Sequence, residues 1–135
     1  MRQLLENMFL DFKDLIKKII RPRGQRSFVA SMPKENCKIL DIGCGKNSIF
    51  LKSVKPDSSV YGIDVGFFEQ TDESRFLYTK LIICKAENFA QSIQNIDSDF
   101  DIVISNHNIE HCENPRRTFS AMVDKTKVGG ILFFA

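Results

Sequence analysis

Short apolar runs recur along the chain and are separated by longer polar stretches. Runs of this length, without strict alternation of apolar and polar residues, predict strands that are buried on both faces of a sheet. The runs lie at residues 39–42, 59–65, 81–86, 100–105 and 131–135. Strands that alternate with helical segments predict an α/β fold with a doubly wound parallel sheet.

The stretches between these runs carry different helical signals. Asn114, followed by proline, supplies an N-cap and a first-turn proline, so we expect a helix from there to about Lys127. A shorter helix is expected from about Asn47 to just before Pro56. Residues 66–80 are polar and weakly periodic, which predicts a loop with at most a short helix.

Residues 2–20 place apolar side chains at helical spacing, which predicts an amphipathic helix that ends at Pro22. Basic residues then cluster between Lys17 and Arg26. These cations either complement the helix dipole and lie in a solvated loop, or contact an anionic substrate or membrane surface. We expect an N-terminal helix and basic loop over residues 1–30, followed by the single domain over residues 31–135.

Composition narrows the function classes. The chain has 135 residues, the size of a single domain, and a net charge of +2, which is too small to indicate a nucleic-acid partner. No apolar run approaches the roughly 20 residues of a membrane span. The four cysteines form no C-x-x-C pair, so we expect reduced thiols, no metal site and a cytoplasmic location.

The candidate site begins where the first strand ends, at Gly43-Cys44-Gly45. A strand, a glycine turn and a helix start bring the backbone close to a nucleotide-like ligand, although a tight turn without a ligand is the alternative. Asp41 would repel a pyrophosphate but attract a ligand that carries an amino group and a sulfonium. We expect Cys44 to be the cysteine that is most accessible to an alkylating reagent.

The second strand closes on Asp64, which lies 19 residues after Gly45. One helix and its loop carry the chain back to a parallel neighbour over such a distance. A carboxylate at that strand's end is placed to accept hydrogen bonds from two ribose hydroxyls. The alternative is a solvated acid at the end of a strand.

Four sequence stretches in this order resemble the class I S-adenosylmethionine-dependent methyltransferases. Ile-Leu-Asp-Ile-Gly-Cys-Gly resembles their first motif more than it resembles an NAD fingerprint, which leaves a nicotinamide-dependent protein as the weaker alternative. The strand that begins Phe-Asp resembles the fourth motif, its Glu-His continuation resembles the small-molecule enzymes, and Val-Gly-Gly resembles their Pro-Gly-Gly turn. The stretches lie at residues 39–45, 99–106, 107–111 and 128–130.

The resemblance covers residues 38–135 and implies a Rossmann-like sheet of order 3-2-1-4-5. It implies S-adenosylmethionine as cofactor and S-adenosylhomocysteine as product. Lys85 departs from the family, which usually has an aspartate there for the adenine, and Glu87 is the nearest acid. The implied cofactor-binding residues are Asp41, Gly43, Cys44, Gly45, Asp64, Val65, Ala86, Glu87, Ser105 and Asn106.

Methyl transfer is an in-line displacement at a carbon that the sulfonium activates, so alignment is the main task of the protein. A general base is needed only for an acceptor that arrives protonated. His107 and His111 are the candidates, with Glu110 orienting a histidine, and a packed histidine or a turn cap is the alternative. The expected acceptor is a small molecule.

Family members continue after the fifth strand with a helix and an antiparallel hairpin. The sequence ends before these elements, so we expect a truncated domain, and a non-catalytic cofactor-binding or protein-interaction domain is the alternative to an enzyme. The uncharged run from Ile131 to Phe134 would then form an open edge strand. Such an edge predicts self-association.

Overall fold

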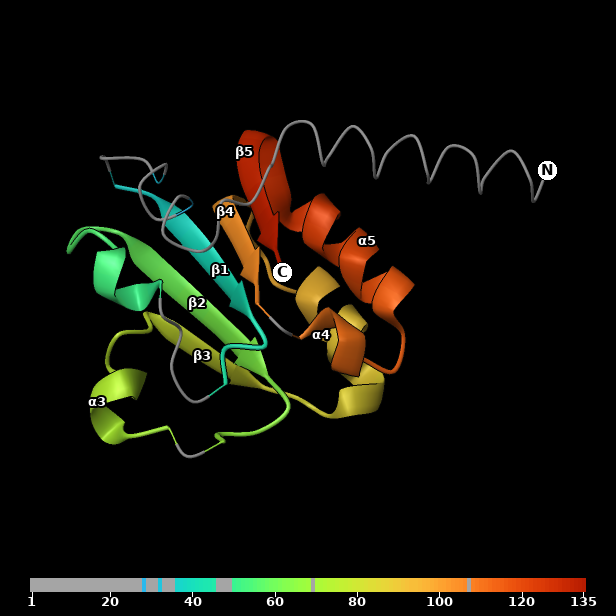
Figure 1. Ribbon diagram of the computed structural model, residues 1–135. Coiled ribbons are helices and arrows are strands. Elements are labelled where there is room, and N and C mark those ends of the chain that lie inside the picture. Colours follow the sequence, from blue (N-terminus) through green and yellow to red (C-terminus); the bar gives the residue numbers. More distant parts are fainter. Residues whose placement is uncertain (1–27, 29–31, 33–35, 46–49, 69, 107) are drawn as a thin grey trace. The chain divides into compact units, whose positions relative to one another are not determined.

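The computed structural model describes residues 28, 32, 36–45, 50–68, 70–106 and 108–135 (Figure 1). The chain separates into two compact units, Met1–Met32 and Pro33–Ala135. The second unit contains the sheet. The expected helix over residues 2–20 and the basic segment after it lie outside the described residues.

A parallel sheet forms the centre of the second unit, and every adjacent pair of its strands is parallel. The strand order is β3-β2-β1-β4-β5, which confirms the predicted α/β class and the order 3-2-1-4-5. The strands are β1 (Lys38–Ile42), β2 (Ser59–Asp64), β3 (Lys80–Ile83), β4 (Phe100–Ser105) and β5 (Thr126–Phe134).

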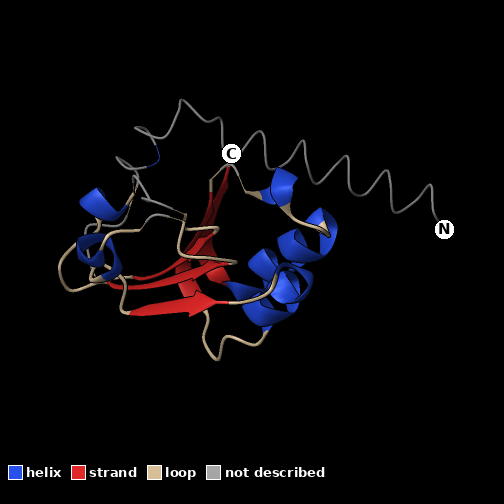
Figure 2. Cartoon of the chain, turned by 90° about the horizontal axis from the view of Figure 1, so that it is seen from below, coloured by secondary structure: helices blue, strands red, loops and turns tan. Residues whose placement is uncertain are grey.

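Two helices, α4 and α5, pack against one face of the sheet, and the short α3 lies near β3 (Figures 1 and 2). Helix α5 begins at Pro115 behind Asn114, whose side chain accepts a hydrogen bond from the Arg117 N–H, as the N-cap signal predicted. The helix ends at Lys125 rather than Lys127, because Thr126 is already extended. The helical elements are α3 (Asp72–Arg75), α4 (Phe89–Gln94) and α5 (Pro115–Lys125), with 3₁₀ turns at Leu51–Ser53, Ala86–Asn88 and Ile109–His111.

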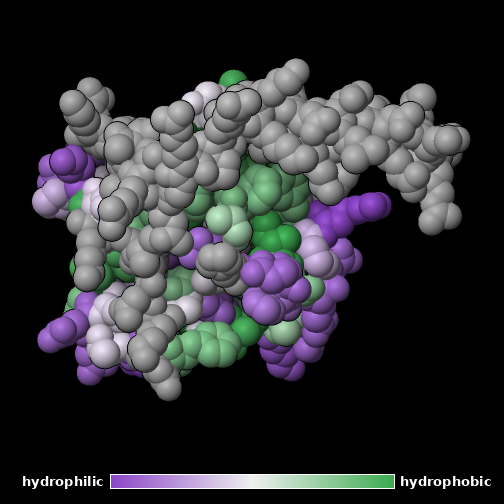
Figure 3. Space-filling view, in the orientation of Figure 1, coloured by the Kyte–Doolittle hydropathy of each residue, from purple (hydrophilic) through white to green (hydrophobic). Residues whose placement is uncertain are grey.

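The core lies between the sheet and the two helices. Each buried aliphatic or aromatic side chain contributes about 1.5–3 kcal/mol to folding. The outward sides of α4 and α5 are mainly hydrophilic (Figure 3). The buried cluster comprises Leu40, Ile42, Ile63, Phe89, Ile93, Ile96, Phe100, Val103, Ala121 and Met122.

Strand β5 contains a bulge that the sequence did not predict. Phe100 pairs with Thr126 and Ile102 pairs with Ile131, so residues 127–130 of β5 lie opposite the single residue Asp101 of β4. Gly129 adopts a φ of +79°, which suits glycine in a bulge. The Val-Gly-Gly stretch is therefore an interruption within one strand, not a turn that precedes it.

The carboxylate of Asp101 connects the amino-terminal ends of three strands through hydrogen bonds. Asp101 accepts hydrogen bonds from the Lys38 N–H and the Lys127 ammonium, each at 2.8 Å. The Lys127 ammonium and then the Lys38 N–H lower the pKa of Asp101 below its ordinary value. This contact stabilises the end of the sheet opposite the glycine turn.

Candidate functional site

A cavity of about 440 Å³ lies at the carboxyl ends of the strands. Its position next to β1, between strands whose connections run in opposite directions, is where open α/β sheets bind ligands. Its volume is within the range of small-molecule sites. The described residues that line it are Gly43, Gly45, Asp64, Val65, Phe68, Ala86, Phe89, Asn108, His111, Cys112 and Glu113.

The glycine turn after β1 forms one wall of this cavity. Gly43 and Gly45 have φ angles of +69° and +49°, a region that favours glycine. The Gly43 N–H donates to the Ile63 carbonyl at 2.8 Å, which joins the turn to β2. A Cβ on Gly43 would lie 2.2 Å from Cγ of Asn108, so the side chain that excludes it is Asn108.

Asp64 is the last residue of β2, and its side chain holds the glycine turn that follows the neighbouring strand β1. Its carboxylate accepts from the Gly45 N–H at 2.6 Å and from the Val65 N–H at 2.7 Å. The side chain is buried, and burial raises the pKa of Asp64 although both N–H groups act to lower it. A carboxylate offers about four acceptor positions, so two hydrogen bonds leave capacity for ligand hydroxyls.

Asp41 and Cys44 are buried beneath the turn and do not line the cavity. Tyr78 Oη donates to Asp41 Oδ2 at 3.0 Å. Cys44 is only 3% exposed, so the expectation that it is the most accessible cysteine is wrong. Burial, and then the charges of Asp41 and Asp64, raise the pKa of Cys44 to about 12.

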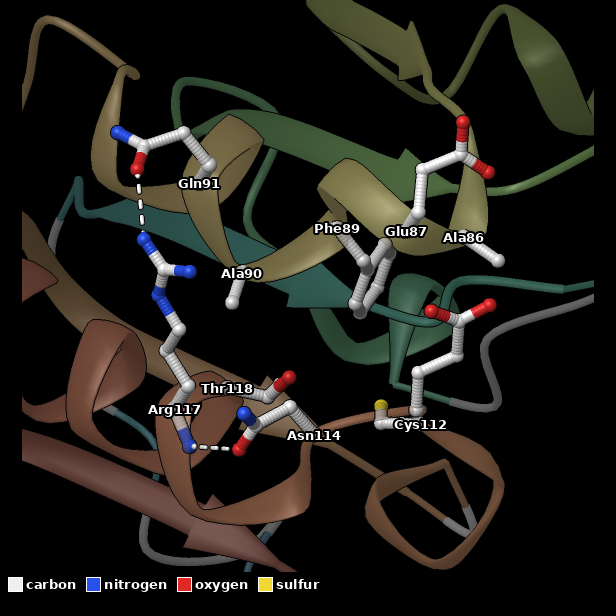
Figure 4. A pocket seen from close by; sticks show the side chains of 10 residues that line it. Ala86, Glu87, Phe89, Ala90, Gln91, Cys112, Asn114, Arg117 and Thr118 are labelled. Atoms are coloured by element: carbon white, nitrogen blue, oxygen red, sulfur yellow. Dashed lines mark hydrogen bonds between the residues drawn. The ribbon is translucent and has the colours of Figure 1, made fainter.

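The end of β3 supplies one side of the cavity through Ala86 and Phe89. Glu87 lines a neighbouring cavity of about 260 Å³ instead, together with Arg117, which donates to Gln91 at 3.0 Å (Figure 4). Lys85 lines neither cavity, and its side chain is 78% exposed. The family's adenine-binding acid has no counterpart at Lys85, and Glu87 faces a different space.

The end of β4 carries the residues that the resemblance implied for catalysis. His111 lines the cavity with a largely exposed ring, 3.9 Å from the Glu110 carboxylate. Ser105 is buried, and its hydroxyl has no hydrogen-bond partner among the described residues. Asn106 does not line the cavity, and His107 lies outside the described residues.

Five lining residues were not singled out from the sequence. They lie in the segments that follow β2, β3 and β4, where no spacing rule indicates which side chain faces a ligand. Phe68 is the non-glycine residue with positive φ, at 37°, among the residues that the structure describes. The five are Phe68, Phe89, Asn108, Cys112 and Glu113.

The charged side chains that line the cavity determine which kinds of ligand it favours. The described lining residues include two carboxylates, Asp64 and Glu113, and no lysine or arginine. Such a lining favours hydroxyl, amino and cationic groups over a pyrophosphate. In the part of the chain that the structure describes, no cluster of metal-ligating side chains occurs, and no helix is long and apolar enough to cross a membrane.

Comparisons with known proteins agree with this geometry. A family model described as "Methyltransferase domain" matches residues 4–135. A ubiquinone biosynthesis O-methyltransferase of Shewanella halifaxensis is 30% identical over 101 residues, which are 73% of this chain and 42% of the relative. A relative of the same name from Bartonella tribocorum is 28% identical over 82% of this chain and 45% of its own length. The chain thus spans less than half of these relatives.

Solved structures share the fold. A TehB-like SAM-dependent methyltransferase from Corynebacterium glutamicum has a TM-score of 0.58 at 20% identity, covering 93% of this chain and 70% of that one. A SAM-dependent methyltransferase from Geobacter sulfurreducens, in complex with S-adenosyl-L-homocysteine, has a TM-score of 0.58 at 15% identity, covering 83% and 47%. From the strand order, the glycine turn and the family match over nearly its whole length, the chain belongs to the methyltransferase-domain family.

Proposed function

We propose that this domain binds S-adenosylmethionine and transfers its methyl group to a small molecule. The observation that carries the proposal is the cavity at the carboxyl ends of the strands, with a glycine turn, the buried Asp64 carboxylate and no cation among its described lining residues. The same lining argues against a nicotinamide dinucleotide, because no described basic side chain faces a pyrophosphate.

The residues present fit the proposed cofactor. Asp64 retains acceptor capacity for the ribose hydroxyls after its two backbone hydrogen bonds. A Cβ on Gly45 would meet only the Gly43 carbonyl, at 3.8 Å, so this stretch of backbone is open to a ligand. Ala86 and Phe89 offer a surface for the adenine. Asp41 and Cys44 act from beneath the turn, because both are buried and neither lines the cavity.

The bound cofactor supplies a methyl group that is already activated by its positive sulfur. The protein then has to hold the acceptor in line with that methyl group, which by positioning alone contributes about 7–11 kcal/mol. His111 lines the cavity and Glu110 lies beside it, which supports a role for this pair in taking a proton from the acceptor. The relatives' name supports an oxygen atom as the methylated group.

A second candidate is a domain that binds the cofactor without turnover. The observation in its favour is that His111, the described histidine that lines the cavity, has a largely exposed ring, so little packing holds it against an acceptor. The four cysteines are free thiols, which supports a reducing compartment such as the cytoplasm for either candidate.

Titration calorimetry with S-adenosylhomocysteine and, separately, with NAD tests the proposal. We expect the first to bind and the second not to bind. Binding of NAD alone would contradict the proposal. Formation of S-adenosylhomocysteine from S-adenosylmethionine, with small molecules that carry hydroxyl groups as trial acceptors, would then distinguish an enzyme from a binding domain.

A further inference from the structure

We propose that Tyr78 and Gln70 are positioning residues that hold the glycine turn in its ligand-binding geometry from the side that does not line the cavity. The effect on the cofactor rests on the proposed function, whereas the effect on the turn does not. Both residues come from the segment between β2 and β3, whose sequence is polar, weakly periodic and without any recognised motif.

Tyr78 reaches the turn by crossing β2. Gly62 is the cross-strand neighbour of Asp41, and a Cβ there would lie 2.7 Å from Cε1 of Tyr78. Because Gly62 has no side chain, the Tyr78 ring can lie across β2 at this position. Beyond Gly62 the Tyr78 hydroxyl donates to Asp41 at 3.0 Å, two residues before Gly43.

The protonated hydroxyl suits this contact. Burial, and then the charge of Asp41, raise the pKa of Tyr78 well above its usual range. The hydroxyl therefore stays a donor at any physiological pH. A buried carboxylate requires such a donor, because an unpartnered charge inside a protein is strongly unfavourable.

Gln70 holds the other side of the same turn. Its amide donates to the Gly45 carbonyl and lies 3.6 Å from Cys44 Sγ. The Gly45 N–H is meanwhile held by Asp64 at 2.6 Å. Hydrogen bonds on the amide nitrogen and on the carbonyl oxygen of Gly45 together fix the orientation of the two peptide groups that flank this cavity-lining residue.

Neither Gln70 nor Tyr78 lines the cavity, so neither is placed to contact the cofactor. Gln70 is 7% exposed and Tyr78 is 8% exposed. Any effect of these two residues on cofactor binding must therefore act through the glycine turn. Cys44, at the centre of the turn and 3% exposed, can report this influence because its buried thiol becomes reachable when the contacts between the turn and these two residues open.

The experiment uses the full chain and the variants Tyr78→Phe and Gln70→Leu, each of which removes hydrogen bonding with little change in shape. The matched control is Ile96→Val, a buried change that follows α4 and is not part of the turn. One readout is the dissociation constant of S-adenosylhomocysteine. The other is the alkylation rate of Cys44 by iodoacetamide, measured by peptide mass spectrometry against Cys37, which is also buried.

We expect each positioning variant to weaken S-adenosylhomocysteine binding by about fivefold or more. We also expect it to raise the Cys44 alkylation rate relative to Cys37 by about tenfold, which corresponds to easier local opening. Ile96→Val should change neither quantity, even at a similar loss of thermal stability. Gln70→Leu keeps the test decisive if Tyr78→Phe does not fold.

Wild-type Cys44 alkylation rates in both variants would overturn the inference, as would an equal increase in the Ile96→Val control. If S-adenosylhomocysteine does not bind the wild type, the proposed function fails, and the alkylation rates alone still decide whether Tyr78 and Gln70 hold the turn. Faster Cys44 alkylation with unchanged cofactor affinity would overturn the claim that the turn's geometry controls binding.

Discussion

Replacing Asp64 with asparagine should separate ligand affinity from stability. The carboxylate accepts two backbone N–H groups and, in the proposed complex, ribose hydroxyls. A hydrogen bond to a charged group contributes about 1.5–3 kcal/mol. Loss of one such bond to the ribose predicts a decrease in S-adenosylhomocysteine affinity of about tenfold to a hundredfold.

The stability of the same variant should change little. Burial raises the pKa of Asp64, so the ionised side chain is disfavoured by its surroundings despite its two donors. Asparagine removes that unfavourable charge but turns an NH₂ group toward one backbone N–H. These two effects oppose each other, and we expect the free energy of unfolding to change by less than about 1 kcal/mol.

Calorimetric titration and urea denaturation of wild type, Asp64→Asn and the exposed control Asp57→Asn measure both quantities. Since the folded pKa of Asp64 is raised, wild-type affinity should fall with decreasing pH before the ordinary value of 3.8 is reached, and Asp64→Asn should lose this dependence. Wild-type affinity in Asp64→Asn would refute the ribose assignment. A stability loss above about 3 kcal/mol would refute the reasoning on charge burial.

Further perturbations address the turn, the sheet and its edge. Gly43→Ala should reduce affinity more than about tenfold, because its Cβ would lie 2.2 Å from Asn108; adding Asn108→Gly should restore part of it by calorimetry. Lys85→Asp should change affinity less than about threefold, since its side chain is 78% exposed outside the cavity; markedly tighter binding would contradict this placement. The lowered pKa of Asp101 stabilises the fold above pH 3.8, and this stability disappears as pH falls through the lower folded value, so Asp101→Asn should show a flatter dependence of thermal unfolding on acid pH. Because β5 lies at the edge of the described sheet, we expect self-association there. Replacing the fully exposed Val128 with lysine should therefore reduce light scattering, and scattering equal to that of the wild type would show that this edge is not the contact.

The alternation of apolar runs and helical segments was sufficient to predict the parallel sheet and the turn after β1, whereas the strand order was implied by the resemblance to the methyltransferases. These features depend on local pattern and on the short connections of parallel strands. The bulge in β5 escaped prediction because it is a register shift against β4, and register is a property of two strands together.

The site was predictable where it follows strand ends and not where it depends on contacts between distant segments. Asp64 and the two glycines face the cavity as the spacing indicated. Cys44 was wrongly expected to be accessible because the residues that cover it, Gln70 and Tyr78, follow it by 26 and 34 positions. No periodic pattern marks either of them.

The central position of β1 has a consequence for the order of folding. β1 pairs with β2, the next strand along the chain, and with β4, which begins about sixty residues later. The turn at its end receives Ile63 from the first neighbour and Asn108 from beyond the second. The ligand pocket is therefore complete only after the long-range pairing has formed, which is the slow step in parallel sheets. A ligand that binds there should leave the refolding rate nearly unchanged and slow the unfolding rate.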